Sequence, residues 1–330
     1  PRLLTCFNPV NALQNIEPAR FAHNWSFGPM VSLSFDRDFN IESGPAMELS
    51  PLVRRVLADN PGPFTFKGTS SFIVGRGDVA IIDPGPDSDQ HLASLLAAVR
   101  GETVSHILIT HSHLDHSPLA RRLKAATGAT LVGYGPVGRP ESSDSDLPRL
   151  DASIDVDFDP EIKLRHGEAI AGKGWTLQGV FTPGHMSNHM SYALEQEKTL
   201  FCGDHVMAWA TSVIAPPDGN MGQYLASLRL LLERDDALYH PAHGPSRAEP
   251  KSLVRAYLVH RKMREDAILA RLKAGDRTIA EIVKANYADI DPRLHAAAGL
   301  STLAHIEHLI ERGLVRQDPQ GPSLTQYIAT

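Results

Sequence analysis

Short apolar runs and segments of helical periodicity alternate along the first three quarters of the chain. Runs rich in β-branched residues are typical of buried strands, and they predict strands at residues 70–75, 79–82, 106–110, 129–134, 175–181, 200–202 and 238–239. Apolar residues at helical spacing predict helices at residues 49–57, 90–100 and 119–127. Strands that alternate with helices, with a hairpin at residues 75–78, favour an α/β sandwich with mixed sheets.

The pattern becomes mainly helical after residue 248. It predicts helices at residues 251–273, 278–286 and 303–312, and an extended arm at residues 313–316. Thr278 and Glu281 form a capping box at the start of the second of these helices. This order of helices and arm is a winged-helix pattern. We therefore expect an N-terminal extension at residues 1–60 packed on the main domain, a main domain at residues 61–247 and a small winged-helix-like domain at residues 248–330.

Composition and charge exclude several classes of protein. The chain has 330 residues, of which 42% are hydrophobic and 21% charged, and no apolar run approaches the roughly 20 residues of a membrane span. The only cysteines, Cys6 and Cys202, lie far apart in sequence, so a disulfide framework is not expected. Residues 248–330 hold 12 Lys and Arg against 10 Asp and Glu, a weak excess for a nucleic-acid binder. We expect a cytoplasmic protein that does not bind membranes.

The densest chemical pattern follows the strand predicted at residues 106–110. Its six residues, His111-Ser-His-Leu-Asp-His116, carry three imidazoles and one carboxylate, and Pro118 delays any helix until after them. Imidazole and carboxylate suit zinc and its neighbours, whereas calcium takes oxygen ligands and structural zinc usually takes thiolates. A polar loop that happens to be rich in histidine is the alternative, but this density at a strand end favours a metal site.

Three later strand ends supply the same kinds of ligand. They carry Thr182-Pro-Gly-His185 with His189 shortly after, Gly203-Asp204-His205, and His240-Pro-Ala-His243. Each residue alone is a weak signal, because histidine is common in loops. A sheet can nevertheless bring the ends of distant strands into one site. Taken together with the segment 111–116, these residues indicate a metal centre.

In order and spacing, these motifs resemble those of the metallo-β-lactamase superfamily over roughly residues 66–247. The resemblance implies an αββα sandwich of the metallo-β-lactamase type with the winged helix at its C-terminal side. It implies that one metal ion is held by His111, His113 and His185, a second by Asp115, His116 and His243, and that Asp204 bridges them. It also implies that Asp83 braces the histidine loop without binding metal. Ala242 departs from the glycine that many relatives have there.

The seven ligand side chains exceed what one four-coordinate ion can bind, so we expect two divalent ions, with Zn²⁺ favoured over Mn²⁺ or Fe. A hydroxide shared by the two ions would then be available near neutral pH for hydrolysis. Asp115 is the candidate for steering the proton. His189 is a further candidate, either facing the substrate or supporting a ligand, and His205 is a weaker one. We interpret Cys202 as a small buried hydrophobe.

The metal motifs and the winged helix together resemble the beta-lactamase-like protein 2 family. This resemblance implies either endoribonuclease activity on single-stranded RNA or, in relatives from polyketide pathways, hydrolysis of an acyl thioester. We favour a small-molecule ester or thioester (an acyl thioesterase or a glyoxalase II-like enzyme), because the main domain is acidic and the apolar residues 207–215 are expected to line the mouth of the site. RNA is the alternative, because the helix at residues 251–273 has seven basic residues and two acidic ones.

Two other functions are disfavoured. The antibiotic-hydrolysing members of the superfamily have Cys or Ser where this chain has Asp204, which argues against a β-lactamase. A non-enzymatic DNA-binding regulator is disfavoured because every expected ligand is present. Specificity is expected to lie in the loops at residues 135–159 and 207–221, and the sequence is compatible with a homo-oligomer.

Overall fold

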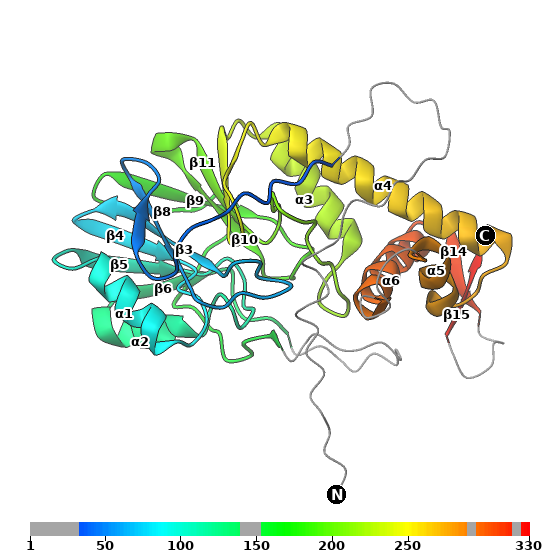
Figure 1. Cartoon of the computed structure of the whole chain (residues 1–330), viewed down its shortest axis with the longest axis horizontal. Helices are drawn as coiled ribbons and strands as arrows, with labels where there is room; N and C mark the ends of the chain where they lie inside the picture. The colour runs from blue at the N-terminus through cyan, green and yellow to red at the C-terminus, as the bar shows by residue number, and fades with distance from the viewer. Residues whose placement is uncertain (1–32, 139–152, 289–294, 319–324) are drawn as a thin grey trace, which may run out of the picture.

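The computed structural model describes residues 33–138, 153–288, 295–318 and 325–330, and its larger part is built on two sheets (Figure 1). The first sheet has seven strands in the order β1 (Ala46–Glu48), β2 (Val53–Leu57), β3 (Ser70–Arg76), β4 (Asp78–Ile82), β5 (Thr103–Leu108), β6 (Thr130–Gly133) and β7 (Ile162–Lys163). The second has six in the order β13 (Arg247–Ala248), β12 (Leu238–Pro241), β11 (Thr199–Gly203), β10 (Met190–Leu194), β9 (Trp175–Phe181) and β8 (Ala169–Gly172). Both sheets mix parallel and antiparallel pairs.

The two sheets share one apolar core, and helices cover their outer faces. Buried side chains from β3 to β6 and from β9 to β11 meet between the sheets. Helices α1 (Asp89–Ala98) and α2 (Leu119–Thr127) cover the first sheet, whereas α3 (Met221–Glu233) and the first half of α4 (Lys251–Ala274) cover the second. These layers are the expected αββα sandwich.

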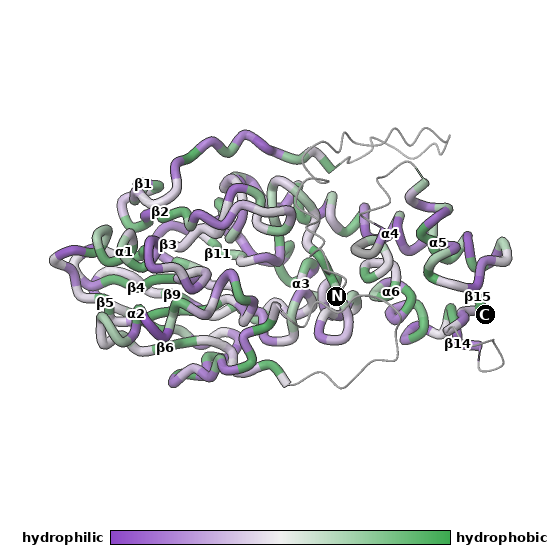
Figure 2. The backbone as a smooth tube through the Cα atoms, turned by 60° about the horizontal axis from the view of Figure 1, so that its bottom comes forward, coloured by the Kyte–Doolittle hydropathy of each residue, from purple (hydrophilic) through white to green (hydrophobic). Residues whose placement is uncertain are grey.

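The C-terminal part has a separate small core. The end of α4 packs there against α5 (Ile279–Asn286), α6 (His295–Glu311) and the hairpin of β14 (Val315–Asp318) and β15 (Gln326–Ala329). The expected capping box begins α5, where the Thr278 amide donates to the Glu281 carboxylate at 2.9 Å. Three helices followed by a two-stranded wing confirm the winged-helix pattern. Figure 2 shows α4, which joins the two parts, alternating between hydrophilic and hydrophobic positions.

The helix predicted at residues 49–57 is wrong, because Val53–Leu57 forms strand β2. All five residues of this strand are buried, so its apolar residues do not alternate with exposed ones. Arg54 can be buried because its guanidinium has partners: it donates to the Ala98 carbonyl at 2.9 Å and pairs with Glu102 at 2.8 Å. Since β2 pairs with β3, the first sheet begins within the stretch expected to be a peripheral extension.

Most of the other predicted elements are confirmed, with shifted ends. The strand predicted at residues 106–110 runs from Thr103 to Leu108, and the last helix begins by His295 and not at residue 303. Helix α3 and strands β1, β7, β8, β10, β13 and β15 were not predicted. Residues 1–32 of the expected extension and 139–152 of the expected specificity loop lie outside the described residues. Among the residues that are described, no helix combines the length and apolarity that a membrane crossing requires.

Candidate metal centre

The seven candidate ligands all lie in loops that follow strands. The loop after β5 carries His111, His113, Asp115 and His116, and the ends of β9, β11 and β12 lead to His185, Asp204 and His243. Strands β11 and β12 are parallel, and β9 runs in their direction because β10 is antiparallel to both β9 and β11. Their carboxyl ends therefore meet at one edge of the second sheet.

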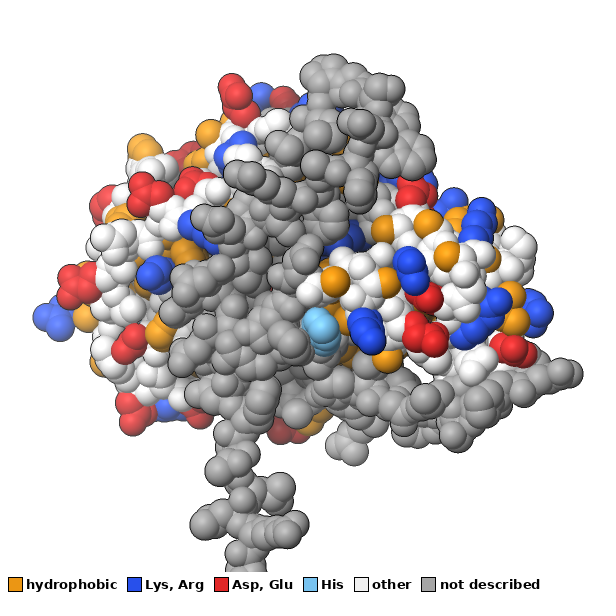
Figure 3. Space-filling view, turned by 45° about the vertical axis from the view of Figure 1, so that its right-hand side comes forward, with side chains coloured by type: hydrophobic (Ala, Val, Ile, Leu, Met, Phe, Trp, Pro, Cys, Tyr) orange, Lys and Arg blue, Asp and Glu red, His pale blue; other side chains and the backbone are white. Residues whose placement is uncertain are grey.

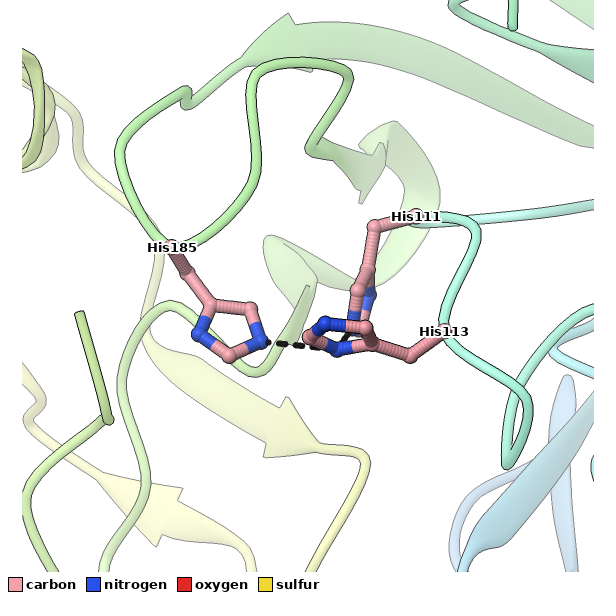
Figure 4. Close-up of side chains that lie close together, drawn as sticks. All are labelled: His111, His113 and His185. Atoms are coloured by element: carbon pink, nitrogen blue, oxygen red, sulfur yellow. Dashed lines mark hydrogen bonds between the residues drawn. The ribbon is translucent and has the colours of Figure 1, made fainter. Parts of the chain in front are cut away.

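Three histidines from two of these loops point toward one another (Figure 4). Nε2 of His111 lies 2.9 Å from Nδ1 of His113, and Nε2 of His185 lies 3.2 Å from the same atom. Burial lowers the pKa of His111 well below its usual value and that of His113 to about 3, so both rings are neutral. Neutral imidazole nitrogens converging on one point are suitable ligands for a zinc-like ion.

The remaining candidate ligands gather beside these three. Nε2 of His243 lies 3.2 Å from Asp115 Oδ2 and 3.3 Å from Asp204 Oδ1. Nε2 of His116 lies 3.4 Å from Asp115 Oδ2. The other oxygen of Asp204 lies 3.7 Å from Nε2 of His185. Asp204 therefore contacts both groups of ligands, which is the position expected of a bridging carboxylate.

Three of the histidines are oriented from behind by oxygen acceptors. These bonds join Nδ1 of His116 to Oδ2 of Asp83 at 3.0 Å, Nδ1 of His185 to the Val213 carbonyl at 2.6 Å, and Nδ1 of His243 to the Gly68 carbonyl at 3.2 Å. A carbonyl or carboxylate oxygen can only accept, so each Nδ1 carries the proton. Each Nε2 is thereby turned toward the centre, the arrangement typical of metal-bound histidine.

The polar atoms at the centre fit divalent metal ions. Among the described residues, Nε2 of His116, Oδ1 of Asp204 and Nε2 of His243 are buried and, although they lie close to one another, none of them makes a hydrogen bond of good geometry. Buried polar atoms are normally satisfied, so several in one place indicate a missing partner. Because these atoms are imidazole nitrogens and carboxylate oxygens, the partner that suits them is zinc or a neighbouring metal.

The charges of this cluster depend on its carboxylates. Burial by itself raises the pKa of Asp115, but the His116 and His243 rings outweigh burial and hold it well below its usual value. Burial lowers the pKa of His243, whereas Asp204 and Asp115 raise it to about 10. Without metal, His243 is therefore a cation held between two carboxylates. A metal ion would replace its proton, because a ligand must be deprotonated to bind.

Asp83 braces the loop without reaching the centre. Its carboxylate accepts bonds from the Thr110 amide and the Thr110 hydroxyl, both at 2.7 Å, and from Nδ1 of His116 at 3.0 Å. All of its hydrogen bonds to this loop thus fall at the junction between β5 and the metal ligands. This agrees with the role expected from the resemblance.

His189 lies behind Asp204. It is fully buried, its Nδ1 lies 2.9 Å from the Thr182 hydroxyl, and its Nε2 accepts from the Asp204 amide at 3.3 Å. Because both ring nitrogens are bonded within the protein, this position supports the ligand-supporting role and not the substrate-facing one. The function of His189 stays a prediction.

The other two residues near Asp204 are packed in the interior. Both ring nitrogens of His205 are buried without a partner among the described residues, and burial lowers its pKa to about 3. The His205 ring packs edge-on against Tyr224, with 4.7 Å between ring centroids. Cys202 is buried, its thiol donates to the Val206 carbonyl at 3.2 Å, and burial raises its pKa. Cys202 therefore behaves as the small buried residue that we expected.

The expectation that residues 207–215 line the mouth of the site is wrong for several of them. Met207, Ala208, Trp209, Ser212 and Ile214 are buried. Trp209 is 8% exposed and stacks on Phe66, with 4.7 Å between ring centroids. This stretch therefore supports the site from within.

Sequence reasoning missed the acceptors that orient the ligands. Val213 and Gly68 act through main-chain carbonyls, which give no signal in a sequence. It also missed Asp155, which accepts from the Ser117 hydroxyl at 2.8 Å and from Arg121 at 3.0 Å. Asp155 secures the segment that follows residue 152 against the histidine loop, and no nearby motif indicates this role.

Comparisons with known proteins agree with this geometry. The family model of the Metallo-beta-lactamase superfamily matches residues 64–243, which include all seven candidate ligands, and that of the Beta-lactamase associated winged helix domain matches residues 278–322. A crystal structure of a Beta-lactamase domain protein from Burkholderia ambifaria has a TM-score of 0.73 and 20% identity, covering 90% of this chain and 97% of that one. At that identity the likeness shows the fold alone.

Three curated relatives are similar over most of the chain. Lactamase-like protein nscB of Aspergillus fumigatus is 30% identical over 85% of this chain and 84% of that protein. The Beta-lactamase-like protein 2 homolog of Caenorhabditis elegans is 30% identical over 82% of this chain and 88% of that protein. The Atrochrysone carboxyl ACP thioesterase of Aspergillus terreus is 30% identical over 70% of this chain and 66% of that protein.

Proposed function

The chain belongs to the metallo-β-lactamase superfamily, and we propose that it is a dinuclear-metal hydrolase that acts on acyl thioesters. That it is a hydrolase of this superfamily follows from the family and from its thioesterase-named relatives. The observation that carries the proposal is the cluster of histidine and aspartate side chains that could hold metal ions. The relative named as an acyl carrier protein thioesterase supports the choice of thioester.

We assign the ligands to two ions, with His111, His113 and His185 holding one, Asp115, His116 and His243 holding the other, and Asp204 reaching both. Two of the three side-chain groups that could hold an ion support this division. Bound divalent ions would lower the pKa of water and polarise the acyl carbonyl. Zn²⁺ suits this ligand set best, and Mn²⁺ or Fe would also be accepted.

Asp115 is the proposed proton acceptor. Its side chain is 28% exposed, compared with 10% for Asp204 and 1% for His243, so it is the more accessible carboxylate to a substrate. Coordination to a metal ion would keep this carboxylate ionised at neutral pH. An ionised, accessible carboxylate can take a proton from attacking water and return it to the leaving thiolate.

Apolar side chains beside the site support an acyl substrate. Leu114, between the proposed ligands His113 and Asp115, is 44% exposed, and Val156 is 53% exposed. Both lie on segments that contact each other, because the Leu114 amide donates to the Ser153 carbonyl at 2.8 Å. Exposed apolar side chains next to polar ligands suit a substrate with an apolar acyl group. We therefore propose that the partner of this site is a small-molecule substrate.

Endoribonuclease activity is the second candidate, and the winged helix favours it. The charge distribution argues against it, because several of the basic side chains that could bind phosphates already have partners within the chain. These pairs are Arg261 with the Ser212 carbonyl, Lys262 with Asp266, Arg264 with Tyr287 and Arg271 with Asp276. Figure 3 shows Lys and Arg interspersed with Asp, Glu and apolar side chains over the visible C-terminal surface. A nuclease would more often present a continuous basic surface.

The test measures metal content together with turnover of two substrates. Purified protein would be assayed for metal, then for thiol release from an acyl N-acetylcysteamine thioester and for cleavage of a labelled single-stranded RNA. We expect about two metal ions per chain, thioester cleavage that Asp204→Ala abolishes, and intact RNA. Asp235→Ala is the control, because Asp235 is exposed and pairs only with the exposed Lys198 among the described residues. RNA cleavage that Asp204→Ala abolishes, without thioester cleavage, would overturn the substrate assignment.

A further inference from the structure

One helix connects the winged helix with the proposed metal centre. Helix α4 begins on the second sheet and ends among the C-terminal helices (Figure 1). Near its middle, Tyr257 and Arg261 are buried and lie one turn apart. Two and three turns further on, Ile268 and Leu272 belong to the core of the winged helix. The same helix therefore contacts both parts of the molecule with buried side chains.

Tyr257 holds the segment that follows Asp204. Its hydroxyl lies 2.7 Å from the Met207 carbonyl and 2.5 Å from the Ala210 carbonyl, and it accepts from the Met207 amide at 3.2 Å. The side chain is fully buried, so these bonds do not compete with water. A buried hydroxyl with three main-chain contacts fixes the path of residues 207–210.

Arg261 holds the next part of the same segment. Its side chain is buried, its Nη2 donates to the Ser212 carbonyl, and its guanidinium lies 5.2 Å from the centre of the Tyr224 ring. The hydroxyls of Ser212 and Tyr224 both donate to the His205 carbonyl, at 2.9 and 2.8 Å. Arg261 is thus bonded to one end of a network whose other end is the residue after Asp204. Charge-assisted bonds of this kind are stronger than neutral ones.

The segment that these two residues hold ends at a proposed metal ligand. Val213 follows Ser212 directly, and its carbonyl accepts from Nδ1 of His185 at 2.6 Å. The position of that carbonyl sets the orientation of the His185 ring, and with it the direction of Nε2. Groups that orient a ligand in this way typically change metal affinity or activity by about 10- to 100-fold when they are removed.

We propose that Arg261 and Tyr257 are positioning residues for the metal centre, which hold residues 207–213 so that the Val213 carbonyl orients His185. The proposal rests on the proposed function, because it takes His185 as a metal ligand. It gives α4 a role in the catalytic part in addition to carrying the winged helix. Neither residue contacts the substrate or the metal, so both act through His185.

The test is metal affinity measured by competition with a chromophoric chelator, together with the absorption spectrum of the Co²⁺-loaded protein. Arg261→Met is expected to weaken Zn²⁺ binding about tenfold and to alter the Co²⁺ spectrum, because the His185 ring turns. Arg261→Lys should recover part of the loss, since an ammonium can still donate to the Ser212 carbonyl. Lys262→Met is the control, because Lys262 is exposed on the same helix and pairs with Asp266.

Tyr257→Phe provides an independent variant that keeps the packing and removes only the hydroxyl. Like Arg261→Met, it is expected to weaken metal binding. If Arg261→Met does not fold, Tyr257→Phe alone tests the proposal. Folded Arg261→Met and Tyr257→Phe proteins with unaltered affinity and unaltered Co²⁺ spectra would overturn the inference and leave the proposed function intact. Failure of the unsubstituted protein to bind metal would overturn the proposed function itself, and the inference with it.

Discussion

Nδ1 of His116 lies 3.0 Å from Oδ2 of Asp83, and neither side chain is more than 2% exposed. Asp83 also accepts hydrogen bonds from the amide and hydroxyl of Thr110, so its carboxylate joins the residues just after β5 to the metal ligand His116. Burial by itself lowers the pKa of His116, but Asp115, Asp204 and Asp83 raise it well above its usual value. The His116 ring is therefore fixed in orientation before any metal binds, and as a cation it would give up its Nε2 proton to a metal ion.

Asp83→Asn is expected to weaken metal binding and hydrolysis by about 10- to 100-fold, the usual cost of losing the partner of a ligand. An amide would place an NH₂ group against a donor, because Asp83 accepts from three donors. Asp83 has a φ of 47°, a conformation that asparagine tolerates, so the backbone would not be strained. Chelator competition measures the affinity, and Asp87→Asn, at an exposed ion pair, is the control. Unchanged affinity in Asp83→Asn would contradict the bracing role.

Gly184→Ala is expected to lower the free energy of unfolding by about 2 kcal/mol or more and to displace the neighbouring His185. Gly184 has a φ of +130°, and a Cβ there would lie 2.3 Å from the Tyr224 amide nitrogen, a backbone atom that cannot move without shifting α3. Gly101→Ala is the matched control, because its φ is +85° and a Cβ would meet no atom within 4 Å. Urea denaturation of both variants separates the steric effect from the conformational one. Equal losses of unfolding free energy in the two variants would mean that α3 shifts to accommodate the added Cβ and would contradict the steric effect.

The ligands could be predicted because their signal is local. Five of the seven lie in the segment 111–116 or directly after Gly184, and strand ends with histidine or aspartate are visible in a sequence. The αββα layers followed from strand order and from the resemblance. The orientation of the ligand rings could not be predicted, because the acceptors at Val213 and Gly68 are main-chain carbonyls from distant segments.

Strand β2 shows a second limit. Its sequence, Val53-Arg-Arg-Val-Leu57, places two charged residues in a fully buried strand, so neither alternation nor an apolar run identifies it. Arg54 is accommodated by Glu102 and Arg55 by the Ser246 hydroxyl, at 2.8 Å each. Such partners depend on tertiary contacts, and tertiary contacts override local pattern.

The stability of the winged helix should depend on pH through Glu307. Burial and the nearby Glu311 carboxylate raise the pKa of Glu307 to about 7 from an unperturbed value of 4.5. The folded state therefore holds a proton that the unfolded state has lost, so this contribution is fully present below about pH 4.5 and is lost as the pH rises through 7. Glu307→Gln removes the ionisation, and its melting temperature relative to that of the unsubstituted protein should rise between pH 5 and 8. A difference that stays constant with pH would contradict this.

Glu265 should stabilise the C-terminal part without affecting the metal centre. It lies on α4 one turn beyond Arg261, it is 4% exposed, and it accepts from His308 at 2.7 Å and from Arg312 at 2.6 Å, both on or next to α6. Glu265→Gln leaves these two donors without a charged acceptor, and since Arg312 is partly exposed we expect a loss of about 2 kcal/mol in urea denaturation. Asp266→Asn, an adjacent exposed position, is expected to cost less than about 0.5 kcal/mol.

Measurements of metal affinity should distinguish the role of Arg261 from that of Glu265, although both lie on α4. Arg261 faces the segment that orients His185, whereas Glu265 faces α6, so Glu265→Gln should leave Zn²⁺ affinity unchanged while Arg261→Met lowers it. Chelator competition on both variants, at a temperature where both are folded, makes the comparison. If Glu265→Gln also weakened binding, the contact between α4 and α6 would itself be needed to place Arg261, and the winged helix would control the metal centre through that contact.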